Sequence, residues 1–544
     1  MDVLERVQNV WELVYPELAY KAGISQAAGR FFVGTEDAQE EIHKKCAEIE
    51  ASLETISDED LRVTARNLAR ACRRRVNHLQ PDKVIAAAAW GLYTIILKGD
   101  SDKPFVAAYL QGVANALKVD AVQWEGRKIR IEIKRHLYKS IVFLQAVLRE
   151  ASQSNTNTLP LADSISSLLM PYKDLYKQDG IETDDVGNLL SLFKQHAGAP
   201  ELLQEYGGLL EDLYDFSWKP DQMHALALAW LAEELPRIDH LVERLAGRYG
   251  CEADFEAVYS EMCARNDIKQ DPIGVAVRVT TALNDYTAEK WLEITPEDRV
   301  EITPTPDYWE ELSTEGSVES FDQLTDRPRH VCFLTPSKNE NYLTMLNVLV
   351  HEYAHAFHNS LSFRLCTQDL LKIESPLRDP STEGIAFHRE WELYEEAREL
   401  PGRAQLRGYD EQLLALFGST STEQAERLEE FELETRMWRV ARFLRVLCDV
   451  EVHLGSRTYS GFLEWAQNRT GFSENRIHDY CFSFLRKPGY ASCYAVPGMH
   501  LASLQAKAQN KGYSRKAFNT EASSMGFYSW TSFERRLRHR FEIG

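Results

Sequence analysis

The sequence lacks the features that would place the protein in a membrane or outside the cell. It has no run of about 18 apolar residues, so a membrane-spanning helix is not expected. Its nine cysteines are odd in number and never form a CxxC pair, which excludes a disulfide framework and a cysteine zinc site. The start, MDVLERVQNVWELVYPELAY, has acidic residues where a secretory signal is basic. We therefore expect a reducing, cytoplasmic location.

Positive charge is also scarce. The chain has 62 lysines and arginines against 83 acidic residues, a formal net charge of -21. Nucleic acids and anionic membranes both bind clustered positive charge, so neither is expected as a partner. A local basic pocket for an anionic substrate stays compatible with this balance.

Helical patterns fill most of the 544 residues. Residues 38–56 and 61–79, among others, place apolar residues three and four apart, as amphipathic helices do. The polar segment 151–160 predicts a loop, and Pro236 predicts a break or kink in a helix. We expect a mostly α protein with an N-terminal helical region at 1–270 and a catalytic region at 271–544, or one integrated fold.

A small β element is expected between about residues 293 and 337. This stretch is rich in proline, and RHVCFLTPS predicts a short strand near 329–335. An edge strand beside the following helix could bind an extended peptide through main-chain hydrogen bonds.

The helix that follows carries an HExxH motif. Residues 341–361 contain no proline or glycine, and His351 and His355 lie one turn apart on one face. Two such imidazoles can bind one zinc ion, and Glu352 beside them can take a proton from water. His358 continues the same face and is a candidate to support the ligands.

The next helix offers a third ligand. DPSTEGIAFHREWELYEEAREL has Ser381 or Thr382 as the predicted N-cap and carries Glu383 and Glu390, which lie two turns apart. We prefer Glu383 as the zinc ligand, with Glu390 orienting a histidine or serving as the ligand instead. The carboxylates that follow are expected on a solvated face: Glu392, Glu395 and Glu396.

A third segment adds candidates for substrate contact. After a Pro-Gly turn, Tyr490 and Tyr494 lie four residues apart at a probable helix start, where a phenol can stabilise an oxyanion. Arg486 and Lys487, just before the turn, are candidates to bind a substrate carboxylate.

These segments resemble two families. HEYAHAFHNSL is similar to the zinc-site segment of the thimet oligopeptidase and neurolysin family, whose third ligand is a glutamate on the next helix with a second glutamate seven residues on. TEGIAFHRE and RKPGYASCYAVPGMHLASLQAKA resemble the bacterial family catalogued as domain of unknown function 885. Two departures from the latter are an HExxH without its Pro-Gly insertion and Tyr490 in place of a glutamine.

The resemblance implies a gluzincin-like zinc metallopeptidase with one zinc per chain and a cleft between helical lobes. The expected reaction is hydrolysis of an amide bond in a peptide or a peptide-like small substrate. The alternatives are a dedicated amidase of one biosynthetic intermediate and an inactive binding or scaffold protein of the same fold. A di-iron carboxylate site would need a second ExxH, and the sequence offers Glu40 to His43.

Overall fold

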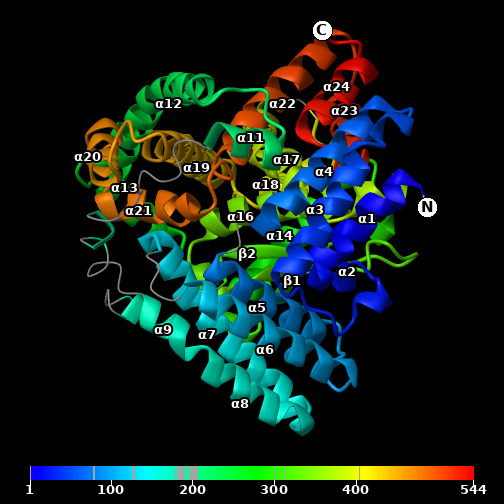
Figure 1. The fold of residues 1–544 in the computed structure, drawn as a ribbon. Coiled ribbons are helices and arrows are strands. Elements are labelled where there is room, and N and C mark those ends of the chain that lie inside the picture. Colours follow the sequence, from blue (N-terminus) through cyan, green and yellow to red (C-terminus); the bar gives the residue numbers. More distant parts are fainter. Residues whose placement is uncertain are drawn as a thin grey trace.

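The protein is mostly α-helical with one small β-sheet, as predicted (Figure 1). The computed structural model describes residues 2–77, 80–124, 129–177, 181, 190, 192–194, 206–300, 302–310, 313–403 and 405–544. The helices before the sheet are α1 (Val3–Val14), α2 (Pro16–Lys21), α3 (Glu36–Glu50), α4 (Glu59–Asn77), α5 (Pro81–Leu97), α6 (Phe105–Trp124), α7 (Ile131–Ser154), α8 (Leu159–Leu168), α9 (Met170–Lys177), α11 (Tyr206–Tyr214), α12 (Pro220–Tyr249), α13 (Phe255–Arg265) and α14 (Pro272–Tyr286).

The second half of the chain contains the sheet and the site helices. Its elements are β1 (Ile302–Pro304), α15 (Asp307–Glu310), β2 (Gly316–Phe321), β3 (Arg329–Leu334), α16 (Tyr342–Leu365), α17 (Asp379–Glu399), α18 (Gly408–Ala415), α19 (Ser421–His453), α20 (Tyr459–Thr470), α21 (Glu474–Cys481), α22 (Ser492–Asn510), α23 (Arg515–Ser524) and α24 (Trp530–Arg540). Figure 1 shows α16 and α17 near the middle of the molecule, with the first helices on one side and α12 and α19 to α21 on another.

The sheet lies against the HExxH helix. Its strand order is β1-β3-β2, with β1 parallel and β2 antiparallel to β3. The predicted strand is therefore confirmed as β3, and β2 is an edge strand. A Cβ added at Gly316 would lie 2.8 Å from Val348 Cγ1 and 3.1 Å from Glu352 Cγ, so glycine allows β2 to approach α16 beside the motif.

The two site helices begin differently. Asn341 caps α16, because its side chain accepts hydrogen bonds from the N–H groups of Leu343 and Thr344. The N-cap predicted for α17 at Ser381 or Thr382 is wrong, since α17 begins at Asp379. Both hydroxyls lie inside the first turn and donate back to the Arg378 carbonyl at 3.0 and 2.8 Å.

Two predicted interruptions of helical structure are shorter than expected or absent. The segment 151–160 is no extended loop: α7 continues to Ser154, a 3-10 turn covers Thr156–Thr158, and α8 starts at Leu159. Pro236 does not break its helix, because α12 continues through it from Pro220 to Tyr249. A proline inside a long helix costs one hydrogen bond, which the packing of α12 along α19 can offset.

The predicted solvated face of α17 is wrong for two of its three carboxylates. Glu392 is 1% exposed and Glu396 is 9% exposed. Arg389 Nη1 lies 2.5 Å from Glu392, and Arg515 Nη1 lies 2.6 Å from Glu396. An acidic run appears solvated when a helix is considered alone, but α16, α19 and α22 all pack on α17, so these acids are buried with cationic partners.

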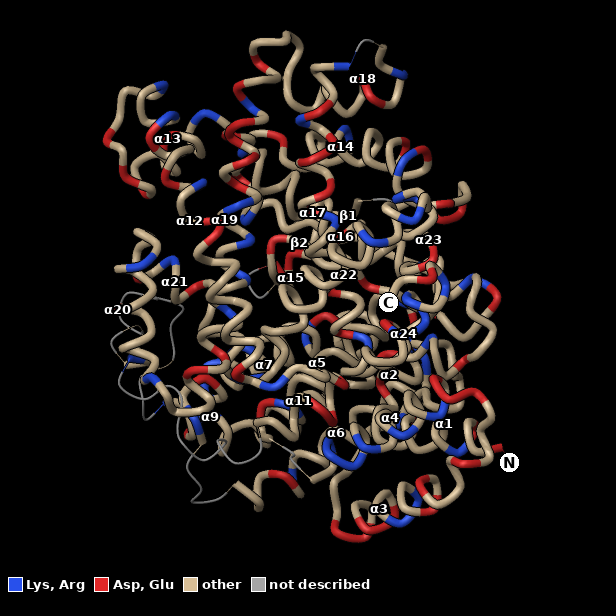
Figure 2. Tube along the Cα trace, turned by 90° about the horizontal axis from the view of Figure 1, so that it is seen from above, with Lys and Arg blue, Asp and Glu red and all other residues tan. Residues whose placement is uncertain are grey.

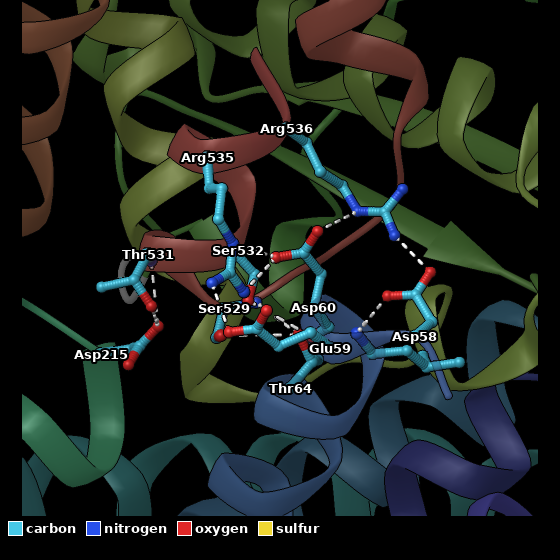
Figure 3. Close-up of polar contacts among 11 residues, drawn as sticks. Asp58, Glu59, Asp60, Thr64, Asp215, Ser529, Thr531, Ser532, Arg535 and Arg536 are labelled. Atoms are coloured by element: carbon cyan, nitrogen blue, oxygen red, sulfur yellow. Dashed lines mark hydrogen bonds and ion pairs between the residues drawn. The ribbon is translucent and has the colours of Figure 1, made fainter. Parts of the chain in front are cut away.

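The C-terminal helix packs on the N-terminal part of the chain. Figure 3 shows Arg535 and Arg536 of α24 directed at three acidic residues at the start of α4, which are Asp58, Glu59 and Asp60. Acidic and basic residues are spread over most of the helices, and many helices carry both (Figure 2). Among the described residues, no helix is long and apolar enough to cross a membrane.

Candidate metal centre

Three predicted ligands converge on one point between α16 and α17. His355 Nε2 lies 3.0 Å from His351 Nε2, and the two rings are nearly perpendicular, at 88°. Glu383 Oε2 lies 3.4 Å from both nitrogens. The three side chains are 11%, 13% and 11% exposed, so the cluster is mostly shielded from water. Within the described ranges, it is the one group found with metal-ligand spacing.

The donor set fits a zinc ion. Tetrahedral zinc with bonds of about 2.0–2.1 Å separates neighbouring ligand atoms by roughly 3.4 Å, close to the spacing of these three atoms. Two imidazoles and one carboxylate also match a catalytic zinc site that keeps a position open. Glu383 Oε2 is buried and makes no hydrogen bond within the described structure, as expected of an atom that faces a cation.

The electrostatics of the cluster favour positive charge beside Glu383. Burial by itself raises the pKa of Glu383, but His355 and His351, each 3.4 Å from Oε2, outweigh it and lower that pKa well below its usual range. Burial by itself lowers the pKa of His351, but Glu383 and Glu390 raise it to about 9. The site therefore stabilises a proton or a cation between its donor atoms.

Glu390 orients His351. Glu390 Oε1 lies 2.7 Å from His351 Nδ1 and accepts a hydrogen bond of 2.6 Å from Arg442 Nη2. Asn347 Nδ2 lies 3.3 Å from the other oxygen. A proton on Nδ1 leaves the Nε2 lone pair directed at the cluster, as in many zinc sites with a carboxylate behind the histidine.

His358 does not support the ligands as predicted. It is 0% exposed, and neither ring nitrogen has a hydrogen-bond partner among the described residues. Its ring meets the ring of Phe527 at 5.3 Å, and burial lowers its pKa to about 3. His358 lies on the same face of α16 one turn beyond His355, about 4.5 Å further along the helix axis. There its ring packs against Phe527 instead of reaching the cluster.

Glu352 lies beside the cluster with its carboxylate free. It is half-buried, and within the described structure no hydrogen bond or ion pair engages it. Burial raises its pKa, His355 and His351 oppose that shift, and Glu383 and Glu315 add to it. A carboxylate with a raised pKa beside a metal site can accept and return a proton.

The two tyrosines form a chain to Glu383. The Tyr490 hydroxyl donates to Glu383 Oε1 at 2.6 Å, and the Tyr494 hydroxyl donates to that of Tyr490 at 3.1 Å. The Tyr494 ring stacks on His351 with centroids 6.1 Å apart and an interplanar angle of 15°. Tyr490 thus orients the Glu383 carboxylate, whereas the ring of Tyr494 stacks on His351.

Arg486 and Lys487 lie behind Tyr490. Lys487 Nζ pairs with Asp379 Oδ2 at 2.8 Å and sits 3.8 Å from the Tyr490 ring centroid. Burial lowers the pKa of Arg486, and the charge of Asp82 opposes this shift. Neither residue contacts the three ligands in the described structure.

Sequence reasoning missed the residues that α19 contributes. Arginines occur at every third position in an otherwise apolar stretch: Arg436, Arg439, Arg442 and Arg445. Arg442 supports Glu390, and Arg445 lies near Tyr494. The spacing was a usable signal, because an arginine on a buried helix face needs a partner.

Comparisons with known proteins identify the fold but no family. No family model and no curated protein matches the chain. A structure described as a candidate lipoprotein from Colwellia psychrerythraea is 14% identical, with a TM-score of 0.62 over 100% of both chains. A second, a candidate lipoprotein of unknown function from Shewanella oneidensis, is 12% identical, with a TM-score of 0.65 over 98% of both chains. At such identities the likeness shows a shared fold alone.

Proposed function

We propose that the protein is a zinc-dependent metallopeptidase that hydrolyses an amide bond in a peptide or a peptide-like small substrate. The observation that carries the proposal is the convergence of His351 Nε2, His355 Nε2 and Glu383 Oε2 from two helices. A free carboxylate on Glu352 and a phenol on Tyr494 beside that cluster support hydrolysis over a purely structural metal site.

His351, His355 and Glu383 would hold one zinc ion per chain. The ion would supply Lewis acidity toward water and toward a substrate carbonyl. Glu352 would take a proton from the attacking water at a carboxylate oxygen and deliver it to the leaving nitrogen. The Tyr494 hydroxyl would donate a hydrogen bond to the carbonyl oxygen as negative charge develops there.

The edge strand favours an extended substrate. β2 pairs on one side only, with β3, and begins at Gly316 beside Glu352. A peptide aligned with the free edge of β2 would be bound through its main chain next to the general base. This arrangement supports a peptide over a compact metabolite, and unpaired cysteines throughout the chain fit a cytoplasmic enzyme.

Metal removal and ligand replacement test the proposal. Hydrolysis of a random library of short peptides should stop when a chelator removes zinc and return when zinc is added. His355→Ala should lose both zinc and hydrolysis. His43→Ala, in the other ExxH sequence, is the matched control and should keep both, since His43 lies on α3 outside the cluster. Hydrolysis by metal-free protein would refute the proposal, and iron in place of zinc would favour the di-iron alternative.

A further inference from the structure

Arg445 differs from the other arginines of its helix. Arg436 and Arg439 pair with Glu234 at 2.5 and 3.0 Å, and Arg442 pairs with Glu390 at 2.6 Å. Arg445 is half-buried and forms no ion pair with any described residue. A shielded cation without an acidic partner is costly unless an anion from outside the chain pairs with it.

The guanidinium of Arg445 is fixed in place by neutral groups. Its Nε donates to the Tyr480 carbonyl at 2.8 Å, and its central carbon lies 4.1 Å from the Phe484 ring centroid. Neither contact uses the Nη atoms, and no other hydrogen bond engages them in the described structure. The fork that binds carboxylates in a bidentate way therefore stays available.

Arg445 lies beside Tyr494, the phenol next to the proposed metal ligands. Its guanidinium carbon lies 5.6 Å from the centroid of Tyr494, whose ring stacks on His351. The Glu315 carboxylate, just before β2, raises the pKa of Arg445, although burial and Arg442 lower that pKa more strongly.

The neighbouring charges distinguish Arg445 from Arg486 and Lys487. Lys487 already pairs with Asp379, and after burial the largest influence on the pKa of Arg486 is Asp82, which raises it. After burial, the largest influence on the pKa of Arg445 is Arg442, which lowers it further. Two arginines side by side, one of them unpaired, form the stronger site for an anion.

We propose that Arg445 binds a carboxylate of the substrate, next to the amide bond that is cleaved. This specificity rests on the proposed function, because it places the carboxylate relative to the metal centre. The carboxylate is either the C-terminus of a short peptide or an acidic side chain near the cleaved bond, and bidentate binding by one guanidinium suits both.

The test uses three libraries of random short peptides on the full-length protein: free acids, the same peptides with amidated C-termini, and amidated peptides without Asp or Glu. Wild-type protein should cleave carboxylate-bearing peptides at least about tenfold faster in kcat/KM than those with none, as expected for a charge-assisted hydrogen bond. If the C-terminus is bound, both amidated libraries should be cleaved slowly compared with the free acids. If an acidic side chain is bound, only the amidated peptides without Asp or Glu should be cleaved slowly.

Arg445→Ala should abolish this preference, mainly through KM, and leave zinc content and the cleavage of carboxylate-free peptides unchanged. Arg445→Lys should keep part of the preference. Arg427→Ala is the matched control: Arg427 stacks on Tyr342 of α16 and lies on α19 about 27 Å from Arg445 along the helix. Equal cleavage of all libraries by wild-type protein, or an unchanged preference in Arg445→Ala, would overturn the inference and leave zinc-dependent hydrolysis standing.

A binding measurement keeps the inference testable if no library is cleaved. Retention of the three libraries on immobilised Glu352→Gln protein requires no turnover. The inference is supported if Glu352→Gln protein selectively retains carboxylate-bearing peptides and the double variant, Glu352→Gln with Arg445→Ala, does not. Absent or unselective retention overturns it.

Discussion

Single residues around the cluster divide into those that would bind zinc and those that orient the ligands. Glu390 belongs to the second group, since it contacts His351 Nδ1 on the side away from the other ligands. It is 1% exposed, and Arg442 balances its charge. Glu390 therefore fixes the direction of the lone pair on His351 Nε2.

Replacing Glu390 should weaken zinc binding without removing a ligand. Glu390→Gln changes the hydrogen bond to His351 and the ion pair with Arg442, so zinc affinity should fall about 10- to 100-fold. A competition titration with a chelator measures this change. Glu395→Gln, on the same helix but away from the cluster, is the control; equal zinc affinity in both variants would exclude an orienting role for Glu390.

Replacement of Tyr490 and replacement of Tyr494 should have different effects. Tyr490→Phe removes the hydrogen bond to Glu383 Oε1, so it should weaken zinc binding, and saturating zinc should restore much of the activity. Tyr494→Phe should keep zinc affinity and lower kcat by about 10²- to 10³-fold, the usual loss of one oxyanion donor. Zinc titration and steady-state kinetics on both variants decide this; similar zinc affinities for the two would contradict the division of roles.

Residue-level prediction from the sequence succeeded where a motif and a helical period coincide. His351, Glu352 and His355 follow from the spacing of the motif, which left Glu383 and Glu390 as alternatives for the third ligand. The structure brings His351, His355 and Glu383 together. The three-residue spacing of Arg442 and Arg445 indicated a buried arginine face, but it could not identify the groups that they contact, which lie on other helices. The burial of Glu392 depends in the same way on how α17 is surrounded, which no local pattern contains.

At the scale of elements, the site depends on close packing between α17 and α22. A Cβ added at Gly498 would lie 2.3 Å from Phe387 Cδ1 and 2.9 Å from the Gly384 carbonyl oxygen. Glycine at this crossing lets the Tyr494 helix approach the Glu383 helix, and this proximity forms the hydrogen-bonded chain between them.

Gly498→Ala should therefore destabilise the protein by about 1–3 kcal/mol despite the better helix propensity of alanine. Gly247→Ala in α12 is the matched control, because nothing lies within 4 Å of its added Cβ. That control should gain about 0.5–1 kcal/mol. Denaturant unfolding measures both changes, and a stabilised Gly498→Ala variant would show that the two helices can separate at no cost.

A buried acid connects the turn before Tyr490 to α19. Asp449 Oδ2 accepts hydrogen bonds from Tyr206 Oη at 2.7 Å and from the Gly489 N–H at 2.9 Å. Burial raises the pKa of Asp449 to about 7, although Tyr206, Gly489 and Arg130 oppose the shift. The other group that faces it, His453 on its own helix, is uncharged near neutral pH because burial lowers its pKa to about 3.

This raised pKa predicts a pH-dependent stability. An unfolded aspartate loses its proton near pH ~3.9, whereas the folded protein keeps it up to about pH 7. The contribution of Asp449 to the free energy of unfolding is therefore largest at low pH and declines as pH rises through that window. Asp449→Asn does not titrate there, so wild-type protein should lose stability relative to it between about pH 5 and about pH 8. Parallel stabilities across that range, measured by denaturant unfolding, would contradict the assignment.

At the scale of the whole molecule, the N-terminal helices are attached to the site region. Trp11 Nε1 donates to the Glu374 carbonyl at 2.9 Å, and Lys21 pairs with Glu319 of β2 at 2.6 Å. Lys21 also pairs with Glu374, which precedes α17, at 3.0 Å. These contacts join the first helices to the edge strand and to the Glu383 helix.

The sequence predicted the class of fold more fully than its assembly. Helical periods and one short strand gave a mostly α protein with a small sheet, and the structure has both. The boundary near residue 270 stays a prediction. The position of α12 on α19, which buries Glu234 between Arg436 and Arg439, depends on long-range packing and has no local signature.

The most direct test of the account compares wild-type protein with Glu352→Gln for zinc per chain and for hydrolysis of the random peptide library, in the same preparations. Glu352 lies beside the ligands without being one, so both proteins should contain one zinc ion per chain. Loss of the general base should lower hydrolysis by about 10²- to 10⁴-fold. A protein without zinc, or a Glu352→Gln variant that cleaves as fast as wild type, would contradict the central claim.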